Sequence, residues 1–171
     1  MLKRPGLRII KTGLAVIISI IISELRPGNG LAFYSAIAAV ICMQPNVNQT
    51  FSKGINRIIG TIFGGFMGLI YLIVIPEGSI PLMVDYIIIS LVATFVIWMM
   101  ASLNRKDAVS IATVVFLSIT INHANDPTGL PLPFALNKTF DTLIGVLVAI
   151  FVNYIDFKIR KEEENLIIER D

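Results

Sequence analysis

Two basic residues occupy equivalent places in two related stretches of this sequence. Residues 56–64 read Asn-Arg-Ile-Ile-Gly-Thr-Ile-Phe-Gly, and residues 137–145, 81 positions later, read Asn-Lys-Thr-Phe-Asp-Thr-Leu-Ile-Gly. Arg57 and Lys138 match each other, each at the start of an expected helix, one at the inner and one at the outer side of a membrane. Two cations at opposite ends of a pathway would attract an anion and pass it on. For Arg57, ordinary anchoring at the inner membrane surface is the alternative.

Three further polar residues follow these cations. Asp141 lies three residues after Lys138, so the two side chains would share one helix face and could neutralise each other. Alternatively, Asp141 is a protonatable carboxylate that couples proton entry to anion exit, or an interfacial residue at a frayed helix start. Thr61 and Thr142 match each other in the two stretches and are expected on the same pathway.

Small residues recur at every fourth position in these two stretches and directly after them. Gly60, Gly64 and Gly68 form two overlapping small-xxx-small steps, and Gly145 and Ala149 repeat this spacing more weakly. Without a Cβ atom, such a face allows another helix to approach closely within lipid. The spacing predicts close helix packing at these five positions, and a narrow pore lined by backbone is the alternative.

The composition defines the environment in which these residues act. Of 171 residues, 55% are hydrophobic and 15% are charged, and the mean hydropathy is +0.79. Soluble domains average about 45–50% apolar and about 25% charged residues, so a soluble domain, a disordered chain and a nucleic-acid-binding protein are excluded. Single residues, Cys42 and His123, exclude an internal disulfide and a cysteine or histidine metal site, and we expect His123 to be solvated. The sequence carries no enzyme motif and implies no cofactor.

Apolar stretches predict an all-α integral membrane protein with six transmembrane helices. They cover residues 7–25, 31–43, 58–76, 86–104, 108–121 and 139–156, of which the second and fifth are short. The first carries Arg8 and Lys11 near its start, whose long side chains can reach the membrane surface. We interpret this stretch as a span rather than a secretory signal, because no small-residue cleavage site follows it.

The positions of lysine and arginine predict the orientation. With both termini in the cytoplasm, 12 of the 14 basic residues lie on the inner side, and only Arg26 and Lys138 lie outside. The sequence therefore predicts a multi-pass protein of the cytoplasmic (inner) membrane. Its transmembrane domain would cover residues 1–156, and residues 157–171 would form a short charged cytoplasmic tail.

The related stretches also predict an internal repeat. Each stretch opens the third helix of a three-helix half, and the halves cover residues 7–76 and 83–156. Three spans is an odd number, so the second half enters the membrane in the opposite direction, as an inverted 3+3 repeat. Sites in such folds lie where the halves meet, which favours a pathway between the third and sixth helices. Chance similarity between glycine-rich helices is the alternative.

Two motifs resemble a known family. Residues 43–46, Met-Gln-Pro-Asn, and residues 57–65, Arg-Ile-Ile-Gly-Thr-Ile-Phe-Gly-Gly, are similar to the aromatic acid exporter / fusaric acid resistance family (FUSC-like) of bacterial membrane proteins. Plant aluminium-activated malate transporters belong to the same broader grouping. The resemblance implies a six-helix membrane domain that exports or conducts organic anions such as aromatic carboxylates. In the malate transporters, basic residues on the third and sixth helices line the anion pore of a dimer, and the matching positions here are Arg57 and Lys138.

We therefore expect membrane transport of organic anions, with a second copy of the chain and the lipid bilayer as partners. Efflux of an aromatic or other carboxylate would be channel-like or coupled to protons. The alternative is a non-transporting structural or regulatory membrane subunit that works with a separate protein. Many family members carry a cytoplasmic domain after the membrane part, whereas this sequence ends shortly after its last expected helix. The sequence leaves open whether the chain acts alone, as a homodimer, or with a partner that supplies such a domain.

Overall fold

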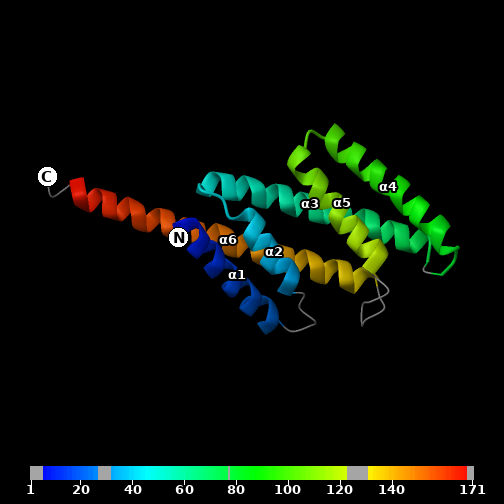
Figure 1. Ribbon diagram of the computed structural model, residues 1–171, viewed down its shortest axis with the longest axis horizontal. Helices are drawn as coiled ribbons and strands as arrows, with labels where there is room; N and C mark the ends of the chain where they lie inside the picture. Colours follow the sequence, from blue (N-terminus) through cyan, green and yellow to red (C-terminus); the bar gives the residue numbers. More distant parts are fainter. Residues whose placement is uncertain (1–5, 27–31, 77, 123–130, 169–171) are drawn as a thin grey trace, which may run out of the picture. The chain divides into compact units, whose positions relative to one another are not determined.

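A computed structural model describes residues 6–26, 32–76, 78–122 and 131–168, with side chains described up to residue 159 except those of residues 131 and 134. These residues form helices and contain no strand (Figure 1). The helices are α1 (Leu7–Leu25), α2 (Ala32–Cys42), α3 (Val47–Val74), α4 (Leu82–Ser102), α5 (Lys106–Asn122) and α6 (Pro131–Ile168). The all-helical prediction is confirmed. His123 lies outside the described residues.

Three stretches are long and apolar enough to cross a membrane. They are Val47–Val74 in α3, Leu82–Ser102, which is α4, and Ala135–Ile159 in α6. The other three expected spans, the inverted repeat and the orientation of the termini stay predictions. Hydropathy identifies these helices because a helix of about 20 apolar residues is long enough to cross a bilayer. A helix also satisfies its backbone hydrogen bonds internally, as lipid requires.

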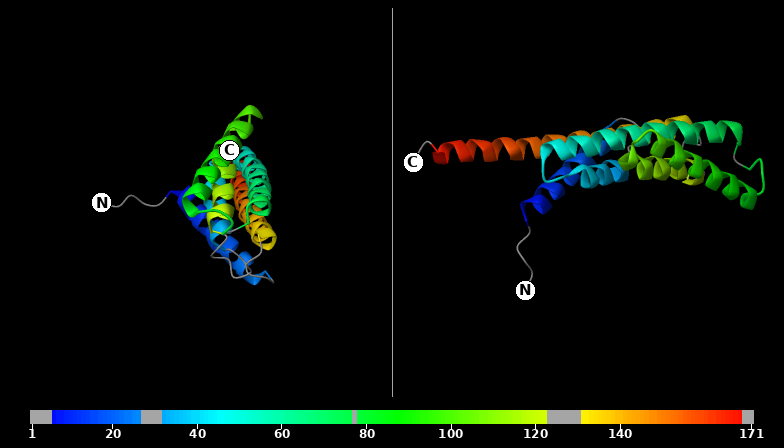
Figure 2. Two further views of the ribbon diagram at one scale, coloured as in Figure 1. Left: turned by 90° about the vertical axis from the view of Figure 1, so that its right-hand side faces the viewer. Right: turned by 90° about the horizontal axis from the view of Figure 1, so that it is seen from above.

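The helices α3 and α6 begin well before the uncharged stretches of the sequence. The helix α3 starts at Val47 rather than near residue 58, and α6 starts at Pro131 rather than near residue 139. The helix α6 then continues to Ile168, so most of the expected tail is helical (Figures 1 and 2). Charged side chains near a helix start do not end a helix, because only their backbone groups belong to its hydrogen-bond ladder.

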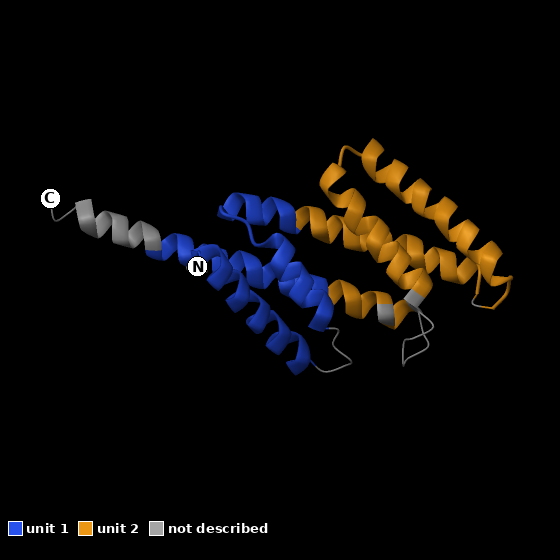
Figure 3. Ribbon diagram, in the orientation of Figure 1, with its two compact units in different colours: residues 1–54, 141–171 blue, residues 55–140 orange. Residues whose placement is uncertain are grey.

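The chain divides into two compact units, which are described separately (Figure 3). Unit 1 comprises Met1–Gly54 and Asp141–Asp171, and unit 2 comprises Ile55–Phe140. Unit 1 therefore contains α1, α2, the start of α3 and most of α6. Unit 2 contains the rest of α3, α4, α5 and the start of α6. In unit 1, α1 packs on α2, and in unit 2, α4 packs on α5.

Small residues allow close packing inside unit 1. Ala15 of α1 and Ala38 of α2 are fully buried. The hydroxyl of Ser35 donates to the Ser19 carbonyl at 3.2 Å, which joins α2 to α1. A Cβ atom at Gly145 would meet the carbonyl oxygen of Ser35 and would lie 2.6 Å from the Cβ atom of Ala38. The helix α6 therefore crosses α2 at Gly145 with no room for a side chain.

Unit 2 contains the corresponding contact between α3 and α5. A Cβ atom at Gly60 would lie 2.8 Å from the carbonyl oxygen of Ala108, and one at Gly68 would lie 2.9 Å from Cγ2 of Ile119. Between them, a Cβ atom at Gly64 would meet the carbonyl oxygen of Ala112. The three glycines thus form the strip of α3 on which α5 packs.

Candidate functional site

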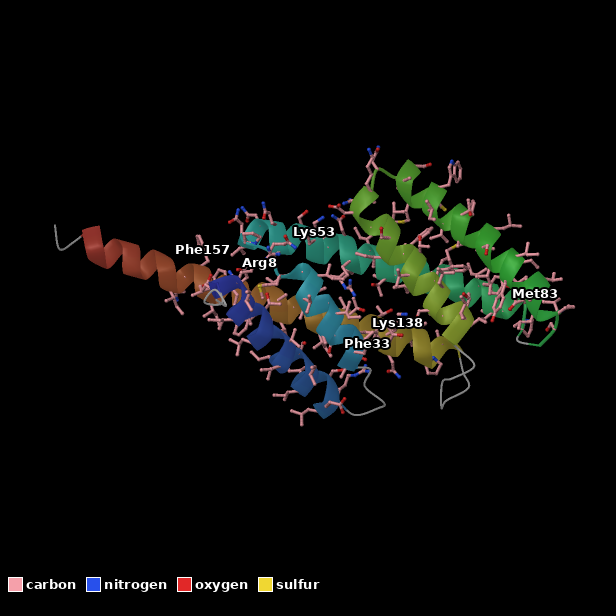
Figure 4. All side chains as sticks on the ribbon, in the orientation of Figure 1. Arg8, Phe33, Lys53, Met83, Lys138 and Phe157 are labelled. Atoms are coloured by element: carbon pink, nitrogen blue, oxygen red, sulfur yellow. The ribbon has the colours of Figure 1, made fainter. Side chains whose placement is uncertain are left out.

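Unit 2 buries two cations that act on each other. Arg57 is 8% exposed on α3 and Lys138 is 1% exposed on α6, where Figure 4 labels it. The positive charge of Arg57 acts on Lys138 electrostatically. The two cations, expected at opposite ends of a pathway, thus lie within electrostatic range of each other in one unit, and their place on a pathway stays a prediction.

The early helix starts explain this difference. Arg57 lies ten residues after the start of α3, and Lys138 lies seven residues after the start of α6. With a rise of 1.5 Å per residue, these positions are roughly 15 Å and 10 Å along their helices. Both residues therefore belong to the interior of a helix rather than to its entrance.

Thr61 follows Arg57 by one helical turn. Its side chain is 1% exposed, and its Oγ1 atom is buried without a hydrogen-bond partner among the residues that the structure describes. A hydroxyl can donate one hydrogen bond and accept others. Arg57, Lys138 and Thr61 together supply two positive charges and a hydroxyl donor, which is a set of groups suited to an anion. We call these three residues the basic site.

Asp141 is fully buried in unit 1 and is held by α1. Its Oδ1 atom accepts a hydrogen bond of 2.7 Å from the Ser23 hydroxyl, and its Oδ2 atom lies 3.2 Å from Nη2 of Arg26 in an ion pair. Arg26 is one of the two basic residues that the orientation places outside. The pairing of Asp141 with Lys138 stays a prediction. Thr142, the next residue of α6, is 2% exposed.

A second ion pair joins α1 to α6 within unit 1. The Nζ atom of Lys11 lies 2.9 Å from Oδ2 of Asp156 and donates a hydrogen bond of 2.7 Å to Oδ1 of Asn153. The side-chain amide of Asn153 in turn donates to Oγ1 of Thr50 at 2.7 Å and to the carbonyl of Gln44 at 3.1 Å. Lys11, which the sequence places at the membrane surface, is thus only 8% exposed.

These two ion pairs have matching spacing, and we call them the α1–α6 clasp. Lys11 on α1 and Arg26 directly after α1 are fifteen residues apart, and Asp141 and Asp156 are fifteen residues apart on α6. Fifteen residues of helix rise about 22 Å. The cations come from α1 and the residue that follows it, and both carboxylates come from α6, so the clasp joins α6 to both ends of the antiparallel helix α1. The equal spacing was a usable signal that the sequence analysis missed.

Removing one charge of the clasp is expected to destabilise unit 1. Arg26→Gln leaves the carboxylate of Asp141 buried with only the Ser23 hydroxyl among the partners named above. We expect the free energy of unfolding to fall by about 3 kcal/mol, the lower end for a broken buried pair, because Arg26 is partly exposed. The measurement is denaturant unfolding of the purified protein in mixed micelles.

The control for this prediction is Glu24→Gln, two residues before Arg26 in the last turn of α1. Glu24 is exposed, and this substitution also changes one charge. We expect it to leave the free energy of unfolding within about 0.5 kcal/mol of the original value. Equal stability of the Arg26→Gln and Glu24→Gln variants would contradict the assignment of the clasp.

The loop between α2 and α3 borders a cavity of about 750 Å³ in unit 1. Pro45, Asn48 and Gln49 line it from the loop and the first turn of α3, and Asn153 and Asp156 line it from α6. Asp156 of the clasp, and Asn153 that shares Lys11 with it, therefore also line this cavity. Part of the Met-Gln-Pro-Asn motif, on which the family resemblance rests, lies at its wall.

Comparison with known proteins identifies the family. The family described as "Fusaric acid resistance protein-like" matches residues 14–152. The UPF0421 protein YgaE of Bacillus subtilis is 30% identical over 150 residues, which cover 88% of this chain and 39% of that protein. The UPF0421 protein OB2406 of Oceanobacillus iheyensis is 27% identical over 149 residues, which cover 86% of this chain and 39% of that protein.

The chain thus spans about two fifths of the length of these curated relatives. No solved structure matches it. The matched region begins within α1 and reaches Val152 in α6, so it includes the basic site and the packing glycines. The resemblance inferred from the two motifs is confirmed, and the chain belongs to the fusaric acid resistance protein-like family of membrane proteins.

Proposed function

We propose that this chain moves organic anions across the cytoplasmic membrane and that the basic site binds the anion during transport. The observation that carries the proposal is the burial of Arg57 and Lys138 in one unit, close enough for their charges to interact. The family is associated with membrane transport or resistance. Fusaric acid, which the family description names, is an aromatic carboxylic acid and is therefore an anion near neutral pH.

Electrostatics explains why this arrangement suits a carboxylate. Burying two like charges in a poor dielectric is costly, and their mutual repulsion adds to the cost. A carboxylate between them relieves the repulsion and accepts hydrogen bonds from both. The guanidinium of Arg57 can bind its two oxygens side by side, whereas the ammonium of Lys138 acts as a point charge. The hydroxyl of Thr61 adds a neutral donor next to Arg57.

The packing of the glycines supports the proposed inverted repeat. Gly64 and Gly145 are matched in the two related stretches, and each meets a backbone carbonyl of a second helix, in α5 and α2 respectively. In the proposed repeat, α2 and α5 are themselves equivalent. The third helix of each half therefore packs on the second helix of the other half, as a two-fold relation would require. We propose six spans with both termini inside as part of the same arrangement.

A flux measurement with the reconstituted chain tests the transport function. Liposomes that contain the purified protein and labelled benzoate are expected to release it faster than empty liposomes. If a pH gradient drives benzoate uphill, the transport is coupled to protons, whereas flux that only follows the benzoate gradient indicates a channel. We propose a homodimer as the working form, and cross-linking in the same liposomes measures it.

The competing proposal is a non-transporting membrane subunit of a larger assembly. It is favoured by the length of the curated relatives, of which the matched region is about two fifths. This proposal predicts no benzoate flux from the chain alone under either gradient. A chain that is folded, inserted and inactive in liposomes would therefore favour the subunit over the transporter.

A further inference from the structure

Unit 2 contains a second polar site, at the ends of its helices. A cavity of about 350 Å³ lies where α3 and α5 end and α4 begins. Its polar lining comes from Tyr71 on α3, Asp85 and Tyr86 on α4 and Thr120 on α5. The rest of the wall is largely apolar, and the volume lies near the lower limit of about 300 Å³ for small-molecule sites.

Asp85 is the charged residue of this wall, and its orientation is fixed. The hydroxyl of Tyr71 donates a hydrogen bond to Oδ1 of Asp85, and Tyr71 is itself only 6% exposed. The ring of Tyr71 packs edge-on against Phe116, with 6.1 Å between the ring centroids. The structure records no hydrogen bond to Oδ2 of Asp85 and no ion pair of Asp85 among the described residues. The carboxylate is therefore half-buried with one oxygen available to a ligand.

The backbone adds further negative potential at the same place. A helix carries roughly half a negative charge at its C-terminal end and half a positive charge at its N-terminal end. Two helices end at the cavity and one begins there, so the backbone contribution is negative overall. Together with Asp85, it favours a cation and disfavours an anion.

The walls indicate which kind of cation fits. Metal cations such as Ca²⁺ require about six to eight oxygen ligands, whereas this cavity offers few oxygens and many apolar groups. Tyr71 and Tyr86 are among its lining residues, and aromatic faces attract ammonium groups within about 6 Å. One carboxylate, two tyrosines and apolar walls are the groups that recognise an alkylated or primary ammonium.

We propose that this cavity binds an organic ammonium group, with Asp85 as its counter-ion and Tyr71 and Tyr86 as its aromatic walls. The site is independent of the proposed anion transport and uses none of its residues. The helices α3 and α4 can each span a membrane, so a cavity at their joined ends lies at a membrane surface. The ammonium can therefore belong to a soluble amine or to a phosphatidylethanolamine headgroup.

Binding of tetramethylammonium tests the soluble source. The protein is placed in nanodiscs of phosphatidylglycerol, which carries no ammonium, and the titration is followed by calorimetry. We expect saturable binding that Asp85→Asn weakens at least about tenfold, because a charged contact is lost while the shape is kept. Tyr86→Leu, which leaves the contact between Tyr71 and Asp85 intact, is expected to weaken binding about two- to fivefold.

Native mass spectrometry tests the lipid source. Protein from mixed micelles is expected to retain phosphatidylethanolamine in preference to phosphatidylglycerol, and Asp85→Asn is expected to remove the preference. Asp107→Asn is the matched control, because Asp107 also lies in the first turn of its helix but does not line the cavity. Ammonium binding in either assay that depends on Asp85 and not on Asp107 supports the proposal. It is overturned if neither assay detects binding, or if the Asp85→Asn and Asp107→Asn variants behave alike.

Discussion

Alanine at Gly64 or Gly145 is expected to cause the largest loss of stability in this protein. The added Cβ atom would meet the carbonyl oxygen of Ala112 in the first case and of Ser35 in the second. These obstacles are backbone atoms of a neighbouring helix, which cannot turn aside as a side chain can. Overpacking usually costs about 1–3 kcal/mol, and we expect each variant to lose at least about 3 kcal/mol of unfolding free energy.

Two other glycines provide the same chemical change without the obstruction. A Cβ atom at Gly65 would have its nearest neighbour 3.9 Å away, at Cδ1 of Ile119, and one at Gly13 would have nothing within 4 Å. Gly65→Ala is the control for Gly64→Ala in unit 2, and Gly13→Ala is the control for Gly145→Ala in unit 1. We expect both controls to unfold at or above the original denaturant concentration, because alanine favours helix formation.

The comparison of each pair decides the prediction. Denaturant unfolding in mixed micelles measures all four variants, and size-exclusion chromatography shows whether each one stays monodisperse. If Gly64→Ala were as stable as Gly65→Ala, the close approach of α5 to α3 would be wrong. The same holds for α6 and α2 if Gly145→Ala matched Gly13→Ala.

Loss of either buried cation is expected to have the largest effect on transport. Lys138→Met keeps the length of the side chain and removes its charge, and Arg57→Gln removes the charge but keeps hydrogen-bond donors. A hydrogen bond to a charged group contributes about 1.5–3 kcal/mol, which corresponds to at least about a tenfold change in binding. We expect each variant to lower benzoate flux in liposomes at least about tenfold.

Stability separates this effect from misfolding. Replacing a buried charge with an apolar residue of similar volume is often neutral or stabilising, and Lys138→Met also removes the repulsion from Arg57. We therefore expect Lys138→Met to lose flux while the free energy of unfolding stays constant or rises. A variant that lost flux and stability together would instead indicate a structural role for Lys138.

A neighbouring basic residue on α3 provides the matched control. Lys53 lies one turn before Arg57 and is half-buried. Lys53→Met makes the same chemical change as Lys138→Met, and we expect flux to stay within about twofold of the original. If the original protein is active and both Arg57→Gln and Lys138→Met leave the flux unchanged, the basic site is not part of the transport pathway.

The sequence by itself determined the helices and the family. Apolar stretches separated by polar loops located all six helices, because helix formation depends mainly on neighbouring residues and lipid permits no unpaired backbone. Spacing alone also identified the glycines, since residues four positions apart share a helix face. Two short motifs were enough to indicate the family, which the matched residues 14–152 confirmed.

Only the tertiary structure decided which charged groups meet. Arg57 and Lys138 lie on different helices. The sequence shows that each charge lies beside an apolar stretch but not where its helix begins, so it predicts the two cations at opposite ends of a pathway. Asp141 pairs with Arg26 across 115 residues of sequence, and Lys11 pairs with Asp156 across 145. Hydropathy describes residues that are close together in the sequence, so it cannot predict such pairs. A partner of this kind depends on how helices pack, which follows from side-chain shape along whole helix faces rather than from residue spacing within one helix.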